Sequence, residues 1–180
     1  MDYDLDGTVR ESKVIFSRCR NLLGWAPDET VSILSKSRLD WLIDLTDILC
    51  DWESKVHTHL TDGQLLLAYA TLGALVEGWL KLFYCLYKRD YSNDERPSNK
   101  DRGGNEIAPN DLSFEKLKQF SRTIIWELHD DMDLWVEKIQ YRRNAIHAFN
   151  DKDIGSRREF IDDINKYCVF VQDILCQFPV

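Results

Sequence analysis

Two arginines, an amide and an imidazole lie within six residues of one another. Arg142 and His147 are separated by four residues, and Arg143 and Asn144 are among those four. A histidine, with an unperturbed pKa of about 6.5, can accept or donate a proton near neutral pH. An arginine can hold a phosphate through two hydrogen bonds and offset the charge that develops in a transition state. These side chains therefore have the chemistry required to cleave a phosphodiester without a metal.

The spacing leaves both arginines as candidates. In a continuous helix Arg142 and His147 would diverge by about 140°, whereas Arg143 and His147 would point only about 40° apart. The plain alternative is an exposed helix end, where basic side chains interact favourably with the helix dipole. Residue types alone favour that alternative, so the surrounding elements have to be considered.

The elements expected to position these residues are all helical. Apolar residues recur at three- and four-residue spacing in five segments, and no segment alternates with period two. The expected helices cover residues 12–23, 30–56, 61–88, 112–148 and 156–178, with Thr61 or Asp62 as the N-cap of the third. Residues 89–111 are charged and contain Gly and Pro, which predicts a long exposed loop. The sequence thus predicts a single all-α domain over residues 1–180, an up-down bundle of about five helices.

Three of these segments have distinctive apolar patterns. The stretch from Leu65 to Tyr87 is long enough to span a membrane, but Glu77 and Lys81 lie near its middle, so we expect a buried core helix. Glu77 should pair either with Lys81 or with the arginine cluster. The last segment carries an apolar stripe suited to a bundle seam or a subunit interface: Phe160, Ile164, Tyr167, Val171, Ile174 and Phe178. The fourth segment carries another: Leu128, Met132, Trp135, Ile139 and Ile146.

The charge and cysteine content of the chain limit its expected partners and location. The 180 residues include 23 Lys and Arg against 31 Asp and Glu, giving a formal charge of −8, and 44% are hydrophobic. Such acidity argues against broad nonspecific coating of nucleic acid but allows a small local basic site. The five cysteines are widely spread without a C-x-x-C pair, and the acidic N-terminus has no apolar signal region. We expect reduced thiols, a cytoplasmic location and no association with membranes.

The string RRNAIHAF, residues 142–149, resembles the signature of the HEPN family, in which an arginine precedes a histidine by four to six residues. An apolar helix with a central glutamate, here LVEGWLK at residues 75–81, and a closing amphipathic helix are similar to that family as well. The resemblance covers about residues 60–178 and leaves residues 1–59 as an N-terminal helical elaboration.

The resemblance implies a homodimer that brings two copies of the motif together across a cleft. It implies a metal-independent endoribonuclease of toxin–antitoxin, abortive-infection or other phage-defence systems, with no cofactor. By that analogy Arg142 and His147 are the catalytic pair, Arg143 and Asn144 adjoin them, and Glu77 is a supporting carboxylate. RNA is the implied substrate, cleaved by attack of its own 2′-hydroxyl, and an antitoxin or regulatory protein is an implied partner.

Two alternatives remain open. HEPN-like modules without catalytic activity bind RNA, nucleotides or proteins, and this chain has Phe149 where some HEPN toxins carry a tyrosine that is adenylylated. A metal-dependent phosphohydrolase would use the imidazoles and carboxylates of residues 57–59 and 129–131. His129 and Asp130 would point about 100° apart on a helix, however, and no third or fourth ligand has a spacing typical of a metal site.

Overall fold

The computed structural model describes residues 4–21, 26–58, 60–122, 124–147 and 151–178. These residues form an all-α structure without a β-strand, as the sequence predicts, but with eight α-helices rather than about five. The helices are α1 (Leu5–Cys19), α2 (Asp28–Lys36), α3 (Leu39–Val56), α4 (Asp62–Leu86), α5 (Lys88–Asn93), α6 (Phe114–Ser121), α7 (Asp131–Arg143) and α8 (Arg157–Cys176). Three short 3-10 turns, η1 (Pro97–Asn99), η2 (Pro109–Asp111) and η3 (Asn144–Ile146), complete the described elements.

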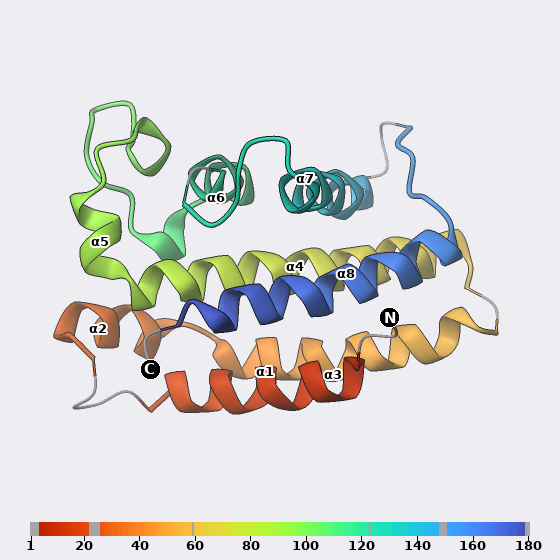
Figure 1. Ribbon diagram of the computed structural model, residues 1–180. Helices are drawn as coiled ribbons and strands as arrows, with labels where there is room; N and C mark the ends of the chain where they lie inside the picture. The colour runs from red at the N-terminus through yellow and green to blue at the C-terminus, as the bar shows by residue number, and fades with distance from the viewer. Residues whose placement is uncertain (1–3, 22–25, 59, 123, 148–150, 179–180) are drawn as a thin grey trace.

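The helices are arranged around α4 and α8, which run side by side through the middle of the molecule (Figure 1). Helices α1 and α3 cover one side of this pair, and α6 and α7 cover the other (Figure 1). The short helices α2 and α5 lie at the end where α4 finishes (Figure 1). The chain segment carrying the arginine pair therefore packs directly on the central helices.

Helix α4 is the core of the bundle. A capping box begins it: the Thr61 hydroxyl accepts a hydrogen bond from the Gln64 amide, and the Gln64 side chain accepts one from the Thr61 amide. Of the two residues expected as the N-cap, Thr61 and Asp62, the structure selects Thr61. Among the described helices α4 alone is long and apolar enough to cross a membrane, yet 61% of its most apolar window is buried inside the molecule. Neighbouring helices, rather than lipid, cover most of that surface.

Helix α8 also begins with a capping box, formed by Ser156 and Glu159. Its stripe faces the bundle: Phe160, Ile164, Tyr167, Val171 and Ile174 are all buried, and Phe178 packs partly buried against the same core. This chain therefore uses the stripe as an internal seam, one of the two roles expected for it.

Two expected helices are divided in the structure. The segment 30–56 is split between α2 and α3, because Ser37 adopts an extended backbone with ψ of 145°. The segment 112–148 is split into α6, α7 and η3; His129 has φ of +65°, and the Asp130 carboxylate caps α7 by accepting from the Asp133 amide at 2.7 Å. Met132, Trp135 and Ile139 are buried as the stripe predicts. Leu128 and Ile146 lie beyond the ends of α7 and are exposed.

Two further boundaries differ from expectation. Helix α1 starts at Leu5 and ends at Cys19, several residues earlier than predicted, because the Asp4 carboxylate caps it through the Gly7 amide. The stretch 89–111, expected to be an exposed loop, contains most of α5 and both η1 and η2. Tyr91 and Asn99 in this stretch are buried, and the Asn99 side chain donates to the Tyr91 carbonyl at 3.0 Å.

Candidate functional site

Arg142, one of the two expected catalytic arginines, is buried between α4, α7 and α8. One guanidinium nitrogen donates to the Tyr69 hydroxyl at 2.6 Å and to Asp163 at 3.1 Å, and another donates to Glu159 at 2.6 Å. Only 3% of the residue is exposed. Desolvation works against its charge, but the carboxylate of Glu159 and the charges nearby raise the pKa of Arg142 above its ordinary value.

The groups around Arg142 enclose it fully. Asp163, itself buried, also accepts hydrogen bonds from the Tyr69 hydroxyl at 2.9 Å and from the Trp135 indole at 3.0 Å. Gly155 passes so close that a Cβ there would overlap the guanidinium of Arg142, and its φ of +72° suits glycine. These hydrogen bonds link α7 to α4 and α8, so the guanidinium of Arg142 contributes to holding the three helices together.

Arg143, the next residue, lies on a different side of α7. Its guanidinium donates to Glu77 at 3.0 Å and to the Asn144 side-chain oxygen at 3.3 Å. Glu77 also pairs with Lys81 at 2.9 Å, so it joins both partners expected for it. The Arg143 side chain is 37% exposed, and that of Glu77 is 16% exposed. This half-buried cluster of Arg143, Glu77, Lys81 and Asn144 can offer cationic and amide donors to an anion.

The close approach of α4 and α7 sets the position of Arg143. Gly73 lies opposite it, and a Cβ at Gly73 would come within 2.6 Å of both Cβ and Cγ of Arg143. Glycine at this crossing therefore lets the arginine stem pass along α4 toward Glu77, one turn further on.

His147 follows η3 and is exposed. The tighter 3-10 turn carries the chain away from the line of α7, and no side-chain hydrogen bond links His147 to the other described residues. The structure does not bring Arg142 and His147 together within one chain, because the first is enclosed and the second faces solvent. Arg143 and Asn144, which are partly exposed, are the polar residues of the motif that remain accessible beside His147 in the sequence.

A pocket of about 380 Å³ adjoins the cluster. Glu77 and Lys81 form part of its wall, and α2, α3 and the turn between them supply Lys36, Arg38 and the apolar Leu42. Arg38 also stacks over Trp41, with 4.1 Å from guanidinium carbon to ring centre. Basic side chains and an exposed aromatic ring are the groups that single-stranded nucleic acid contacts.

The residues considered for a metal site are dispersed. His57 is the C-cap of α3 and lies 3.4 Å from Glu53, whereas His129 belongs to the connection between α6 and α7. Helix α3 and the helices α6 and α7 lie on opposite sides of the central pair (Figure 1). Within the described ranges no group of three or more His, Cys, Asp or Glu side chains could hold a metal ion. His59 is outside those ranges.

Sequence reasoning missed the partners of Arg142, namely Tyr69, Glu159 and Asp163. One signal was present: Asp163 directly precedes Ile164 of the buried stripe, and an acidic residue bordering an apolar face needs a cationic partner. Glu159 combines two tasks, because it also completes the capping box of α8. The hydrogen bond from Arg142, followed by that from the Ser156 amide, lowers the pKa of Glu159 to about 2.

Comparison of the chain with family models, with curated proteins and with solved structures found no match. The case for a HEPN-type site therefore depends on the motif and on the geometry around it. Phe149 and its neighbours at 148 and 150 lie outside the described residues.

Proposed function

We propose that this chain is a metal-independent endoribonuclease of HEPN type in which Arg143 and His147 act on RNA. The observation that carries the proposal is the opposite environment of two adjacent arginines. Arg142 is enclosed by intramolecular partners, whereas Arg143 is half exposed, held by Glu77 and followed by Asn144 and the exposed His147. Arg143 is the arginine that a substrate can reach.

The chemistry needs few groups. The 2′-oxygen of the RNA attacks the neighbouring phosphorus, the bond from phosphorus to the 5′-oxygen breaks, and a 2′,3′-cyclic phosphate and a 5′-hydroxyl result. One proton leaves the 2′-hydroxyl and one reaches the 5′-oxygen; imidazoles serve both transfers. Arg143 binds the phosphate oxygens and offsets the added negative charge. Glu77 orients Arg143, and Asn144 supplies an amide beside it.

A homodimer belongs to the same proposal. One His147 in the neutral form can take the first proton, and the His147 of a second copy in the charged form can give the other. Two motifs facing one another would also double the local positive charge in an acidic protein. We propose a cytoplasmic protein of a toxin or phage-defence system, held in check by an antitoxin or regulatory protein. Its five cysteines are free thiols.

The enclosure of Arg142 favours one second candidate, a non-catalytic HEPN-like module that binds RNA, a nucleotide or a protein. In such a module Arg142 would hold the bundle together, and Arg143, Lys81 and the adjoining pocket would bind a partner without cleaving it.

One experiment separates the two. Purified protein is incubated with total RNA in EDTA, and the wild type is compared with His147→Ala and Arg143→Ala. The matched control is His57→Ala, which removes another exposed histidine at a helix end. We expect cleavage by the wild type and by His57→Ala, with at least about a hundredfold loss in the other two variants.

The outcomes are distinct. Cleavage that survives both substitutions excludes these residues as the site. RNA binding without cleavage by the wild type supports the non-catalytic module. Activity that EDTA abolishes supports the metal-dependent alternative.

A further inference from the structure

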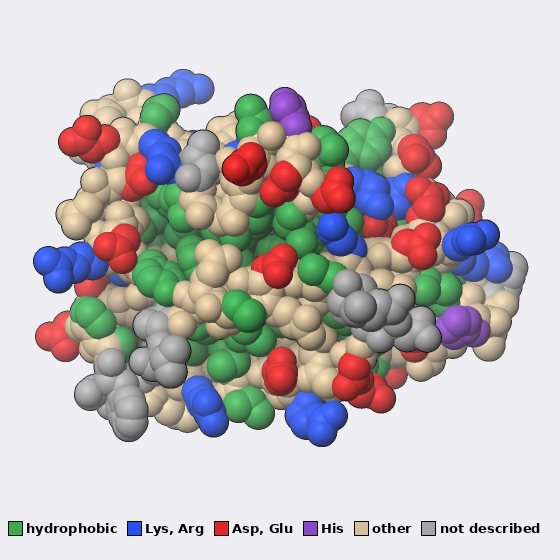
Figure 2. All heavy atoms as spheres, in the orientation of Figure 1, with side chains coloured by type: hydrophobic (Ala, Val, Ile, Leu, Met, Phe, Trp, Pro, Cys, Tyr) green, Lys and Arg blue, Asp and Glu red, His purple; other side chains and the backbone are tan. Residues whose placement is uncertain are grey.

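A second pocket lies at the C-terminal end of α4, where α5, α6 and the end of α8 converge. Its volume is about 590 Å³, within the range of roughly 300–1,000 Å³ typical of small-molecule sites. Figure 2 shows hydrophobic side chains gathered between α6 and the C-terminal end of α8. None of the residues proposed to act on RNA lines this pocket.

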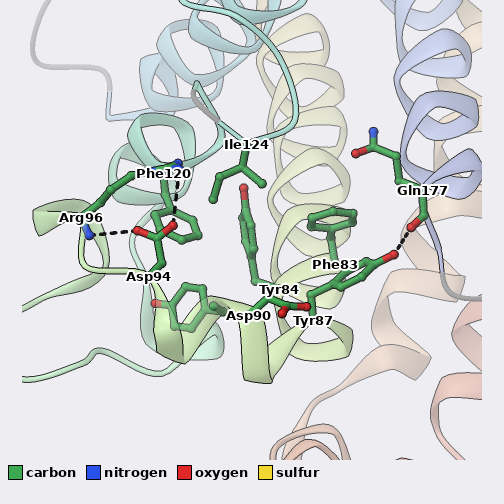
Figure 3. Close-up of a pocket in the computed structure, with 10 residues that line it drawn as sticks. Phe83, Tyr84, Tyr87, Asp90, Asp94, Arg96, Phe120, Ile124 and Gln177 are labelled. Carbon is green, nitrogen blue, oxygen red and sulfur yellow. Dashed lines mark hydrogen bonds and ion pairs between the residues drawn. The ribbon is translucent and has the colours of Figure 1, made fainter.

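Aromatic residues are half of the ten that line it (Figure 3): Phe83, Tyr84, Tyr87, Tyr91 and Phe120. The rings brace one another, with centroids 4.9 Å apart for Tyr84 and Phe120 and 4.9 Å for Phe83 and Tyr87. Their hydroxyls are already engaged within the protein: Tyr84 with Ser121 at 2.7 Å, Tyr91 donating to the Ile107 carbonyl at 2.5 Å, and Tyr87 donating to the Gln177 carbonyl. Four of these rings are themselves buried, so a ligand meets the more open Tyr87 ring and the exposed Ile124, and it finds no free tyrosine hydroxyl.

The charged side chains of the pocket do not cancel. Asp94 and Arg96 face each other beside the Phe120 ring, 3.5 Å apart, and the Asp94 carboxylate also accepts from the Arg96 amide at 2.9 Å. Asp90 is exposed and makes no hydrogen bond or ion pair with another described residue. Two carboxylates and one guanidinium leave one unit of negative charge, carried by Asp90 beside the Tyr87 ring (Figure 3).

We propose that this pocket binds an organic ammonium compound. The apolar body of the ligand lies against Tyr87 and Ile124, which cover the buried rings, and its ammonium group donates to Asp90. Aromatic faces attract cations as well, so the walls and the carboxylate favour the same ligand. The residual negative charge disfavours phosphates and other anions. The proposal concerns a site separate from Arg143 and does not depend on ribonuclease activity.

Binding of three probes of one shape tests this. Titration calorimetry or ligand-observed NMR on the full chain compares 2-phenylethylammonium, the neutral 2-phenylethanol and the anionic 3-phenylpropionate. We expect the ammonium probe to bind at least about tenfold more tightly than the alcohol, as one charge-assisted hydrogen bond would provide. The carboxylate probe should bind most weakly.

Two variants locate the site. Asp90→Asn should weaken the ammonium probe by about tenfold and leave the alcohol unchanged, because only the charge is removed. The matched control is Glu95→Gln, an exposed acid of the same stretch that does not line the pocket; it should change neither. Equal affinity for the three probes, absence of ammonium binding, or an unchanged affinity of the ammonium probe in Asp90→Asn would each overturn the proposal.

Discussion

At the residue scale, the neighbouring Arg142 and Arg143 differ in burial and in their partners. Arg142 has its donors occupied by Tyr69, Asp163 and Glu159, and solvent barely reaches it. Arg143 makes a half-buried pair with Glu77 and keeps part of its side chain in water. This difference in burial assigns stability to the first residue and, in our proposal, substrate binding to the second.

Substitution of the two arginines should therefore affect stability unequally. Arg142→Met removes a buried cation from Asp163, which keeps Lys138 as its remaining cationic partner. We therefore expect a loss of about 3 kcal/mol, the lower end of the cost of breaking a buried pair. Arg143→Met removes a partly exposed pair, which is worth at most about 1 kcal/mol. Urea unfolding followed by circular dichroism measures both. Equal losses, or a larger loss in Arg143→Met, would show that Arg142 is not the structural residue.

Glu159 makes stability depend on pH. Its pKa is lowered to about 2 in the folded chain, chiefly by Arg142, from about 4.3 in the unfolded chain. The stability contribution is therefore fully present above the unfolded value and is lost as the pH falls toward 2. In Glu159→Gln, which keeps the capping box, the free energy of unfolding should fall less steeply between pH 5 and 2 than in the wild type. The difference between the two proteins should be smaller than the pKa gap alone implies, because the Glu159 side chain is 48% exposed. Parallel pH curves for the two proteins would contradict this.

At the element scale, the crossing of α4 and α7 places Arg143. Gly73, which has no side chain, leaves room for the Arg143 stem between the two helices. Because the chain breaks between α6 and α7, α7 begins as a separate helix at its Asp130 cap and lies along the central pair. The 3-10 turn after Arg143 then turns His147 outward. Function at this end of α7 should depend on the fit between two helices as much as on the polar residues themselves.

Gly73→Ala tests that dependence. The added methyl group meets Cβ and Cγ of Arg143, so we expect a loss of about 1–3 kcal/mol and reduced RNA cleavage. Gly63→Ala in the same helix meets no atom within 4 Å and should be neutral or stabilising by up to about 1 kcal/mol. Unfolding midpoints and cleavage rates of both variants are compared. A Gly73→Ala protein that matches Gly63→Ala in both respects would exclude the crossing as the positioning element.

The elements that the sequence predicts well are those with a strong local signal. Helix α4 has a capping box and a long apolar run, and α8 has a cap and a regular stripe. The breaks inside 30–56 and 112–148 have weaker signals in the sequence. The first break occurs at Ser37, whose backbone is extended, and the second at His129, which has a positive φ and precedes the capping Asp130. The burial of Arg142 could not be foreseen, because it depends on carboxylates that only the tertiary fold brings to it.

At the scale of the whole molecule, the proposed function requires an acidic chain to bind RNA, which calls for a small local site. Acidic and basic side chains are interspersed on the face shown in Figure 2, and the formal charge is −8. The basic groups near Arg143 are few, namely Lys81 and, at the adjoining pocket, Lys36 and Arg38. Affinity should therefore come from a few phosphate contacts and from stacking, rather than from a broad positive field.

The salt dependence of RNA binding measures this. With two to three phosphates neutralised, the logarithm of the affinity for single-stranded RNA should fall with the logarithm of salt concentration with a slope of about −2. Fluorescence anisotropy of a labelled oligoribonucleotide gives the slope; it uses His147→Ala, the variant expected not to cleave the probe. A slope of about −5 or steeper would require a broad basic surface and would contradict a focused site.

The most direct measurement is the chemistry of the RNA ends present after RNA is incubated with the purified protein in EDTA. Attack by the 2′-hydroxyl, with Arg143 binding the phosphate and His147 transferring protons, leaves 2′,3′-cyclic phosphates and 5′-hydroxyls. We expect these end groups from the wild type and from His57→Ala, and no such fragments from Arg143→Ala or His147→Ala. Fragments with 3′-hydroxyl and 5′-phosphate ends, or intact RNA with the wild type, would contradict the proposed ribonuclease.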